Sequence, residues 1–244
     1  YARAVHLLLD KAGLKAKDIV AIGAHGQTIR HQPELGENLS YTHQTLNAAL
    51  LAEKTGIDVV ADFRSRDLAA GGHGAPLVPA FHAQQFASTD NVAIVNIGGI
   101  ANLTLLPRDG EVSGFDCGPG NMLMDAWIFD QQGNLFDKNG AWAALGKANE
   151  ALLQRMLADP FFAKAPPKST GRDNFHLGWL QEQIANENFL TEDVQATLLH
   201  LTANTILESL AVHASQTQKL IVCGGGAKNT ALMNLLKTKA SDFL

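Results

Sequence analysis

Residues 91–106 read NVAIVNIGGIANLTLL, and this stretch decides the fold class of the chain. Its two halves are rich in β-branched and aliphatic residues, and a Gly-Gly pair separates them. They predict two strands, over 91–97 and 102–106, joined by a tight turn. A second turn at 107–110 leads into a third expected strand, 112–116. Three strands joined in this way predict an antiparallel meander.

Outward from this stretch, helical and extended patterns alternate. The apolar spacing predicts helices over 2–11, 46–54, 122–129, 149–158, 191–215 and 229–239. Short apolar runs predict further strands over 19–24, 59–61 and 220–223. We expect an α/β fold with mixed sheets flanked by helices. The composition changes from loop-rich to strand-rich near 90/91, so we expect a first domain over 1–90 and a second over 91–244.

Between these elements we expect polar connections. Residues 62–67 are expected to form a polar loop, 71–76 to lack regular structure because of their glycines, and 30–38 to be exposed. Asn121 stands where the helix 122–129 begins and is a candidate N-cap.

Composition excludes several classes of protein. The 244 residues are 46% hydrophobic and 18% charged, which favours a packed core over disorder. The formal net charge is -5 without a basic run, which argues against nucleic acid as a partner. No apolar run approaches the ~18 residues of a membrane helix, so we expect no membrane partner. The two cysteines, Cys117 and Cys223, are far apart, which excludes a disulfide scaffold and favours a cytoplasmic location. The nine histidines show no metal-binding spacing, so we expect no metal ligands.

Three glycine clusters are the main indication of function. Gly98-Gly99 lets backbone amides approach a phosphate closely, although a plain hairpin turn explains it equally well. Three consecutive glycines, 224–226, follow a strand and precede a helix, which suits close approach of a nucleotide; neither the Walker A spacing nor GxGxxG is present. In the cluster 114–121, Asp116 ends an expected strand and is a candidate general base; a turn or cap aspartate is the simpler alternative. Asp125 is more simply an exposed helix carboxylate.

The ordered set of motifs resembles the anhydro-N-acetylmuramic acid kinase family. The matching segments are 23–31 (GAHGQTIRH), 62–64 (DFR), 71–82 (GGHGAPLVPAFH), 96–102 (NIGGIAN), 114–121 (GFDCGPGN), 166–172 (PPKSTGR), 193–197 (DVQAT) and 223–229 (CGGGAKN). The resemblance implies a two-domain, actin-like ATPase (ribonuclease H-like) fold. It implies a Mg-ATP-dependent kinase that opens 1,6-anhydro-N-acetylmuramic acid with water and phosphorylates its 6-oxygen, in peptidoglycan recycling.

The resemblance also assigns residues. Asp116 matches the catalytic aspartate. The ATP-binding set is Gly98, Gly99, Asn102, Gly224, Gly225, Gly226 and Asn229. The substrate-binding set is His25, Gln27, Arg64, Gly118 and Asn121, with Arg64 suited to a carboxylate because its planar fork binds one bidentately.

The chain departs from the family pattern in several places. Cys117 stands where threonine is usual and His73 where glutamine is usual. The family's N-terminal phosphate hairpin has no counterpart before Tyr1 and its last segment none after Leu244, so we expect a fold incomplete at both termini and a chain with little kinase activity by itself. A homodimer is plausible for the family, with 191–215 as a candidate surface.

Three other functions stay open on the sequence. They are an actin-like nucleotide-binding module without sugar chemistry, a transcriptional regulator on a sugar-kinase fold, and a kinase for another sugar. No helix-turn-helix supports the regulator.

Overall fold

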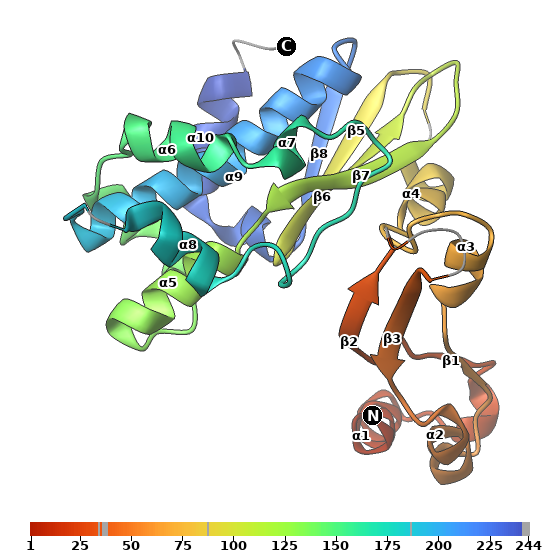
Figure 1. The fold of residues 1–244 in the computed structure, drawn as a ribbon. Coiled ribbons are helices and arrows are strands. Elements are labelled where there is room, and N and C mark those ends of the chain that lie inside the picture. The colour runs from red at the N-terminus through yellow and green to blue at the C-terminus, as the bar shows by residue number, and fades with distance from the viewer. Residues whose placement is uncertain (34, 36–38, 87, 186, 241–244) are drawn as a thin grey trace. The chain divides into compact units, whose positions relative to one another are not determined.

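The computed structural model describes residues 1–33, 35, 39–86, 88–185 and 187–240. The chain divides into two compact units, Tyr1–Ala75 and Pro76–Leu244, which are described separately (Figure 1). We expected the division at 90/91. It falls earlier because helix α4 packs on the strands of the second unit: the His82 ring nitrogen Nδ1 lies 2.7 Å from the Thr104 hydroxyl.

The first unit is built from short elements. They are α1 (Ala2–Ala12), η1 (Ala16–Asp18), β1 (Ile22–Gly23), β2 (Gln27–Gln32), β3 (Tyr41–Thr45), α2 (Ala48–Thr55), β4 (Val59–Val60) and α3 (Ser65–Ala69). β1 pairs with β4 in parallel, and β2 pairs with β3 antiparallel. Helices α1 and α2 confirm the helical predictions, and each ends at a glycine in the left-handed conformation.

One prediction for the first unit was wrong. We expected a loop from 62 to 67, but α3 begins at Ser65, where the Asp62 carboxylate accepts the Ser65 hydroxyl hydrogen bond. In the stretch 30–38, which we expected to be exposed, Arg30 and Leu35 are exposed and residues 31–33 are half-buried. Residues 30–32 belong to β2, because cross-strand pairing with β3 overrides their polar composition. Residues 34 and 36–38 of that stretch lie outside the described residues.

The second unit is a sheet covered by helices. Its elements are α4 (Pro79–Phe86), β5 (Val92–Ile97), β6 (Ile100–Leu106), β7 (Ser113–Pro119), α5 (Met122–Gln132), η2 (Lys138–Gly140), η3 (Ala143–Leu145), α6 (Glu150–Leu157), α7 (Pro160–Ala163), α8 (Leu177–Ile184), α9 (Thr191–His213), β8 (Lys219–Cys223), η4 (Gly225–Lys228) and α10 (Thr230–Ala240). The sheet order is β7-β6-β5-β8, with β8 parallel to β5. The predicted meander is confirmed.

The two faces of this sheet differ in character. One face carries Val95, Ile97, Leu103 and Phe115, which are buried in the main core together with α9. The other face carries Val92, Ile94 and Leu106, which form a smaller cluster with Ala83 of α4. Because side chains alternate along a strand, residues in register across the strands share a face.

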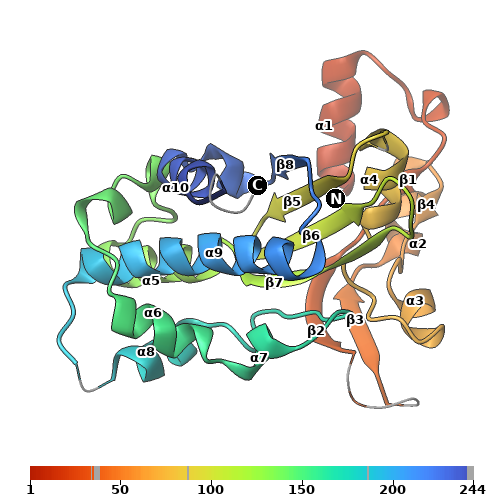
Figure 2. The same ribbon diagram turned by 90° about the horizontal axis from the view of Figure 1, so that it is seen from above.

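Helix α9 runs along the sheet within the second unit (Figure 2). It is apolar on most sides and buries residues over nearly its whole length, from Val194 to Leu210. A helix that is apolar all round belongs in a core. The interpretation of this helix as a dimer surface was therefore wrong, because its length reflects a central position in the core.

No helix in the described part of the chain is long and apolar enough to cross a membrane.

Candidate active site

The glycine clusters of the second unit meet at the carboxyl ends of β5 and β8. The N–H groups of Gly120 and Asn121 each donate to a carbonyl of the Gly98-Gly99 turn, at 2.8 Å. A Cβ at Gly120 would lie 2.4 Å from the Gly98 carbonyl oxygen, so this approach requires glycine.

The third cluster packs against the same turn. Gly224 has φ +85°, and a Cβ there would lie 2.6 Å from the Ile97 carbonyl oxygen. A Cβ at Gly226 would lie 2.4 Å from Ile97 Cγ2. The glycine turns therefore pack directly on each other, and no side chain of these glycines covers the backbone at the carboxyl ends of the strands. Ligands bind at this end of the strands in open α/β sheets.

Asn121 stands at the first position before α5, as expected, but its side chain makes no capping hydrogen bond. Its Nδ2 instead donates to the carbonyls of Ile97 and Gly98, at 3.1 and 2.9 Å. The side chain ties the start of the helix to the Gly98-Gly99 turn because those two carbonyls lie within its reach.

A row of polar residues crosses the α4-facing side of the sheet. Cys223, Asn96, Asn102 and Asp116 are successive register partners on β8, β5, β6 and β7. The Oδ1 atom of Asn102 is buried and has no hydrogen-bond partner among the described residues. A buried acceptor without a partner is costly, so this atom is a natural contact for a bound donor. Asn96 was not among our predicted site residues; only the strand register reveals it.

Asp116 lies inside β7 and is 5% exposed. Its Oδ2 accepts a hydrogen bond from the backbone N–H of Thr170 at 2.9 Å. It is neither a turn residue nor a helix cap, so the structure removes the simpler alternative that the sequence left open. Gly118, two residues on, has φ +150°, and a Cβ there would lie 2.7 Å from the Phe162 ring.

Cys117 belongs to the opposite face. It is buried in the main core, where burial raises the pKa of its thiol to about 12 despite a hydrogen bond to Ser209. The thiol is therefore protonated and packed as a small apolar group. The Cys117 side chain therefore contributes to core packing on the face opposite the row of polar side chains.

A cavity of about 450 Å³ lies next to the third glycine cluster. Its lining includes Asn121, Asp125, Asp137, Gly225 and Asn229. Burial, and to a smaller extent the neighbouring Asp137, raise the pKa of Asp125 to about 6. The interpretation of Asp125 as an exposed helix carboxylate was wrong, because its face of α5 borders this cavity. Asn229 also caps α10 by accepting from the Leu232 N–H at 3.1 Å.

The remaining predicted residues lie in the first unit. Arg64 Nε donates to His25 Nε2 at 2.8 Å, and the Arg64 guanidinium also donates to the Gly74 carbonyl. His25 Nδ1 lies 2.9 Å from the Gly26 carbonyl, which makes it the donor and Nε2 the acceptor. The structure thus brings His25 and Arg64 together. Gln27 is exposed on β2, where its side chain is 3.4 Å from the Thr28 carbonyl.

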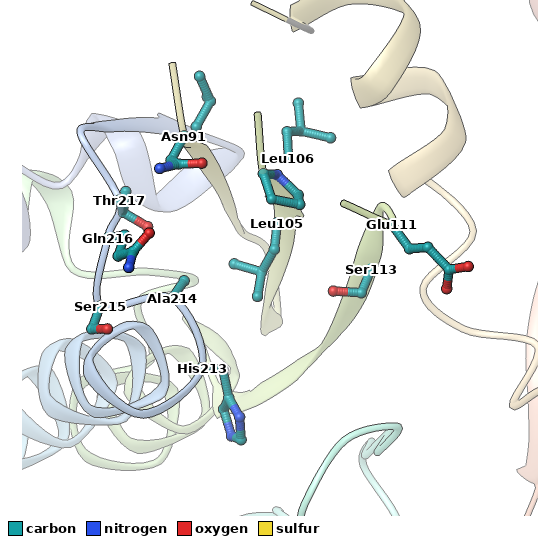
Figure 3. A pocket seen from close by; sticks show the side chains of 12 residues that line it. Asn91, Leu105, Leu106, Glu111, Ser113, His213, Ala214, Ser215, Gln216 and Thr217 are labelled. Atoms are coloured by element: carbon teal, nitrogen blue, oxygen red, sulfur yellow. The ribbon is translucent and has the colours of Figure 1, made fainter. Parts of the chain in front are cut away.

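A second cavity, of about 370 Å³, lies at the other ends of the strands, beside Asn91 and Leu105. Ser113 of β7 and Thr217 from the loop before β8 lie on opposite sides of it (Figure 3). It is separated from the glycine clusters by the length of the strands.

Within the described residues, no group of three or more His, Cys, Asp or Glu side chains could hold a metal ion.

Comparison with known proteins identifies the family. The family model described as anhydro-N-acetylmuramic acid kinase matches residues 1–243. The chain belongs to the anhydro-N-acetylmuramic acid kinase family. It is 56% identical over 253 residues to the anhydro-N-acetylmuramic acid kinase of Ralstonia nicotianae, covering all of this chain and 66% of that protein. It is 56% identical over 237 residues to the one of Pseudomonas fluorescens, covering 96% of this chain and 64% of that protein. The chain thus spans just under two thirds of the length of these kinases.

A solved structure shows the same fold. The activator of the 2-hydroxyisocaproyl-CoA dehydratase from Clostridium difficile, with bound ADPNP, matches with a TM-score of 0.50 and 16% identity. The match covers 98% of this chain and 72% of that one. The predicted family and the predicted mixed α/β fold are both confirmed.

Proposed function

We propose that the protein carrying these residues is an ATP-dependent kinase. It opens 1,6-anhydro-N-acetylmuramic acid with water and phosphorylates the freed 6-oxygen, giving N-acetylmuramic acid 6-phosphate for peptidoglycan recycling. The observation that carries this proposal is the register row ending at buried Asp116, beside three converging glycine clusters, in a chain of this family.

The nucleotide occupies the glycine-lined end of the sheet in this proposal. The Gly99 N–H of the Gly98-Gly99 turn faces the phosphates, while the Gly98 N–H donates to the Ile100 carbonyl at 3.1 Å and holds the turn. Gly224, Gly225 and Gly226 leave room for the adenosine. The 450 Å³ cavity that Gly225 and Asn229 line supports this placement. Mg²⁺ enters with ATP as the Mg-ATP substrate, held mainly by phosphate oxygens and water.

Asp116 acts as the general base. Its carboxylate takes a proton from water as the water oxygen bonds to the anomeric carbon and the bond from that carbon to the 6-oxygen breaks. The 6-oxygen bonds to the γ-phosphorus, and ADP leaves. The N–H of Thr170 stabilises the ionised carboxylate that this role needs.

The sugar contacts we propose are Gly118 and Asn121 in the second unit and His25, Gln27 and Arg64 in the first. The Arg64–His25 hydrogen bond supports the proposal because it fixes the guanidinium in one orientation. A fixed planar fork is suited to the lactyl carboxylate of the sugar. Reduced Cys117 and Cys223 agree with a cytoplasmic enzyme.

The test is incubation of the full-length gene product with Mg-ATP and 1,6-anhydro-N-acetylmuramic acid, followed by phosphorus NMR and mass spectrometry. We expect one 6-phosphate product that has gained one water. ATP turnover indifferent to the sugar would instead support a nucleotide-binding module without sugar chemistry. Turnover with other amino sugars only would support a kinase for another sugar.

A further inference from the structure

The loop that follows α7 runs beside β7 and contacts Asp116 twice through its backbone. The N–H of Asp116 donates to the Lys168 carbonyl at 3.1 Å. The N–H of Thr170 donates to Asp116 Oδ2 at 2.9 Å. The direction of the Asp116 carboxylate therefore depends on where residues 168–170 are held.

The Lys168 side chain fixes this segment to α7. Lys168 is 4% exposed, and its Nζ donates to the carbonyls of Phe162 and Phe161, at 3.2 and 3.4 Å. The same nitrogen lies 4.8 Å from the centre of the Phe161 ring. That ring packs edge-on against buried Phe175, at 5.6 Å between centroids, so the anchor point is itself rigid.

Burying the ammonium group of Lys168 costs desolvation free energy, which other contacts must offset. Burial lowers the pKa of Lys168, since the surroundings disfavour its charge. Among the described residues no carboxylate lies within salt-bridge distance of it. An apolar side chain would fill the same space without the cost of desolvating a charge. The contacts with two carbonyls and one ring are what lysine adds at this position.

We propose that Lys168 is a positioning residue: by tying residues 168–170 to α7, it holds the Thr170 N–H against the Asp116 carboxylate. This inference rests on the proposed role of Asp116 as the general base. Lys168 acts through the loop backbone and touches neither substrate in this proposal.

The first test is Lys168→Met in the full-length gene product, assayed with Mg-ATP and 1,6-anhydro-N-acetylmuramic acid across the acidic and neutral pH range. We expect kcat to fall roughly 10- to 100-fold, because small displacements of a catalytic group cost this much. The KM for ATP stays unchanged. The acidic limb of kcat/KM moves to higher pH, because the ionised carboxylate loses a firmly held donor. Lys168→Arg restores most of the activity, since its guanidinium donates to the same carbonyls and stacks on aromatic rings.

The matched control is Lys164→Met. Lys164 is an exposed lysine of the same loop, and its replacement leaves kcat and the pH profile unchanged. A second pair of variants acts on the hydrogen bond directly and keeps the test valid if Lys168→Met does not fold. Thr170→Pro removes the N–H donor and moves the acidic limb in the same direction, whereas Thr170→Ser keeps the donor and leaves the limb in place.

The outcomes separate cleanly. Unchanged kcat and pH profile in Lys168→Met overturn the positioning role. A Lys168→Met protein that melts at lower temperature but keeps the wild-type acidic limb also overturns it, because Lys168 would then serve folding alone. A wild-type enzyme that does not phosphorylate the sugar overturns the proposed function, and the positioning role with it, before any substitution is made.

Discussion

The two units of this chain begin from similar sequence patterns and end with very different interiors. In the first unit, the buried apolar residues among those described are Ala24, Leu51 and Ile57. Helix α1 buries none of its residues, and Leu8 is 67% exposed. In the second unit, a four-stranded sheet, α9 and the surrounding helices share one continuous core. An amphipathic pattern thus creates a helix in both, but a core forms only where several layers close on each other.

The comparison also explains the location of the candidate site. The glycine clusters and Asp116 need atoms held to within a few tenths of an ångström, because a Cβ at Gly120 would come within 2.4 Å of the Gly98 carbonyl oxygen. Such precision requires a close-packed support, which the second unit supplies. In the first unit, the predicted site residues Arg64 and His25 lie outside the helices and strands and are held by a hydrogen bond to each other.

The largest effect is expected when the two units are separated. Residues 76–244 should unfold cooperatively on heating, followed by circular dichroism. Residues 1–75 should show no cooperative transition, because so little apolar surface is buried. A cooperative transition in residues 1–75 would break the comparison.

The next largest effect is on turnover. Asp116→Asn in the full-length gene product should lower kcat by about 10²–10⁴-fold, the usual worth of a general base, while ATP affinity measured by calorimetry is retained. Asp109→Asn is the control, since that side chain is 90% exposed on the β6–β7 turn. Near-normal turnover in Asp116→Asn would remove the assignment.

A pair of glycine substitutions tests the packing of the second unit. Gly226→Ala places a Cβ 2.4 Å from Ile97 Cγ2 and should destabilise the chain by about 1–3 kcal/mol in urea unfolding. Gly225→Ala meets nothing nearer than 3.7 Å, at Asn121 Nδ2, and should change stability by less than about 0.5 kcal/mol. Equal effects of the two would mean that the turn is not packed as described.

The smallest effect is the pH dependence at Asp125, whose raised pKa is about 6. In the folded chain this carboxyl holds its proton up to about pH 6, whereas the unfolded chain releases it near its ordinary value of 3.8. The stability that protonation gives is full below that ordinary value and is lost as the pH rises through 6.

Asp125→Asn should therefore stabilise the chain at neutral pH. The gain in the free energy of unfolding should be less than about 1 kcal/mol, because solvent screens the half-exposed group. It should vanish towards pH 4, where the carboxyl of the folded wild-type chain is protonated. Melting temperatures of both proteins at the two pH values measure it. Asp130→Asn, on an exposed position of the same helix, should show no such dependence. A constant difference between wild type and Asp125→Asn would contradict the burial of this carboxyl.

Much of the fold could be predicted because its signals are local. The strands on both sides of Gly98-Gly99, the glycine ends of α1 and α2, and the long helix 191–213 all follow from periodicity and turn residues. The strands β2 and β3 were missed because their polar residues are held by pairing with each other. The location of α9 in the core also escaped prediction, since length alone does not show what surrounds a helix.

By itself, the sequence determined the family, the meander and the identity of the glycine clusters, because ordered motifs and turn chemistry are properties of neighbouring residues. Only the tertiary structure decided which of these segments meet. The register placed Asn96 and Asn102 in line with Asp116 and turned Cys117 to the opposite face. It also brought Thr170, 54 residues away in the chain, to the Asp116 carboxylate. Contacts of this kind depend on how layers pack, and no local pattern encodes them.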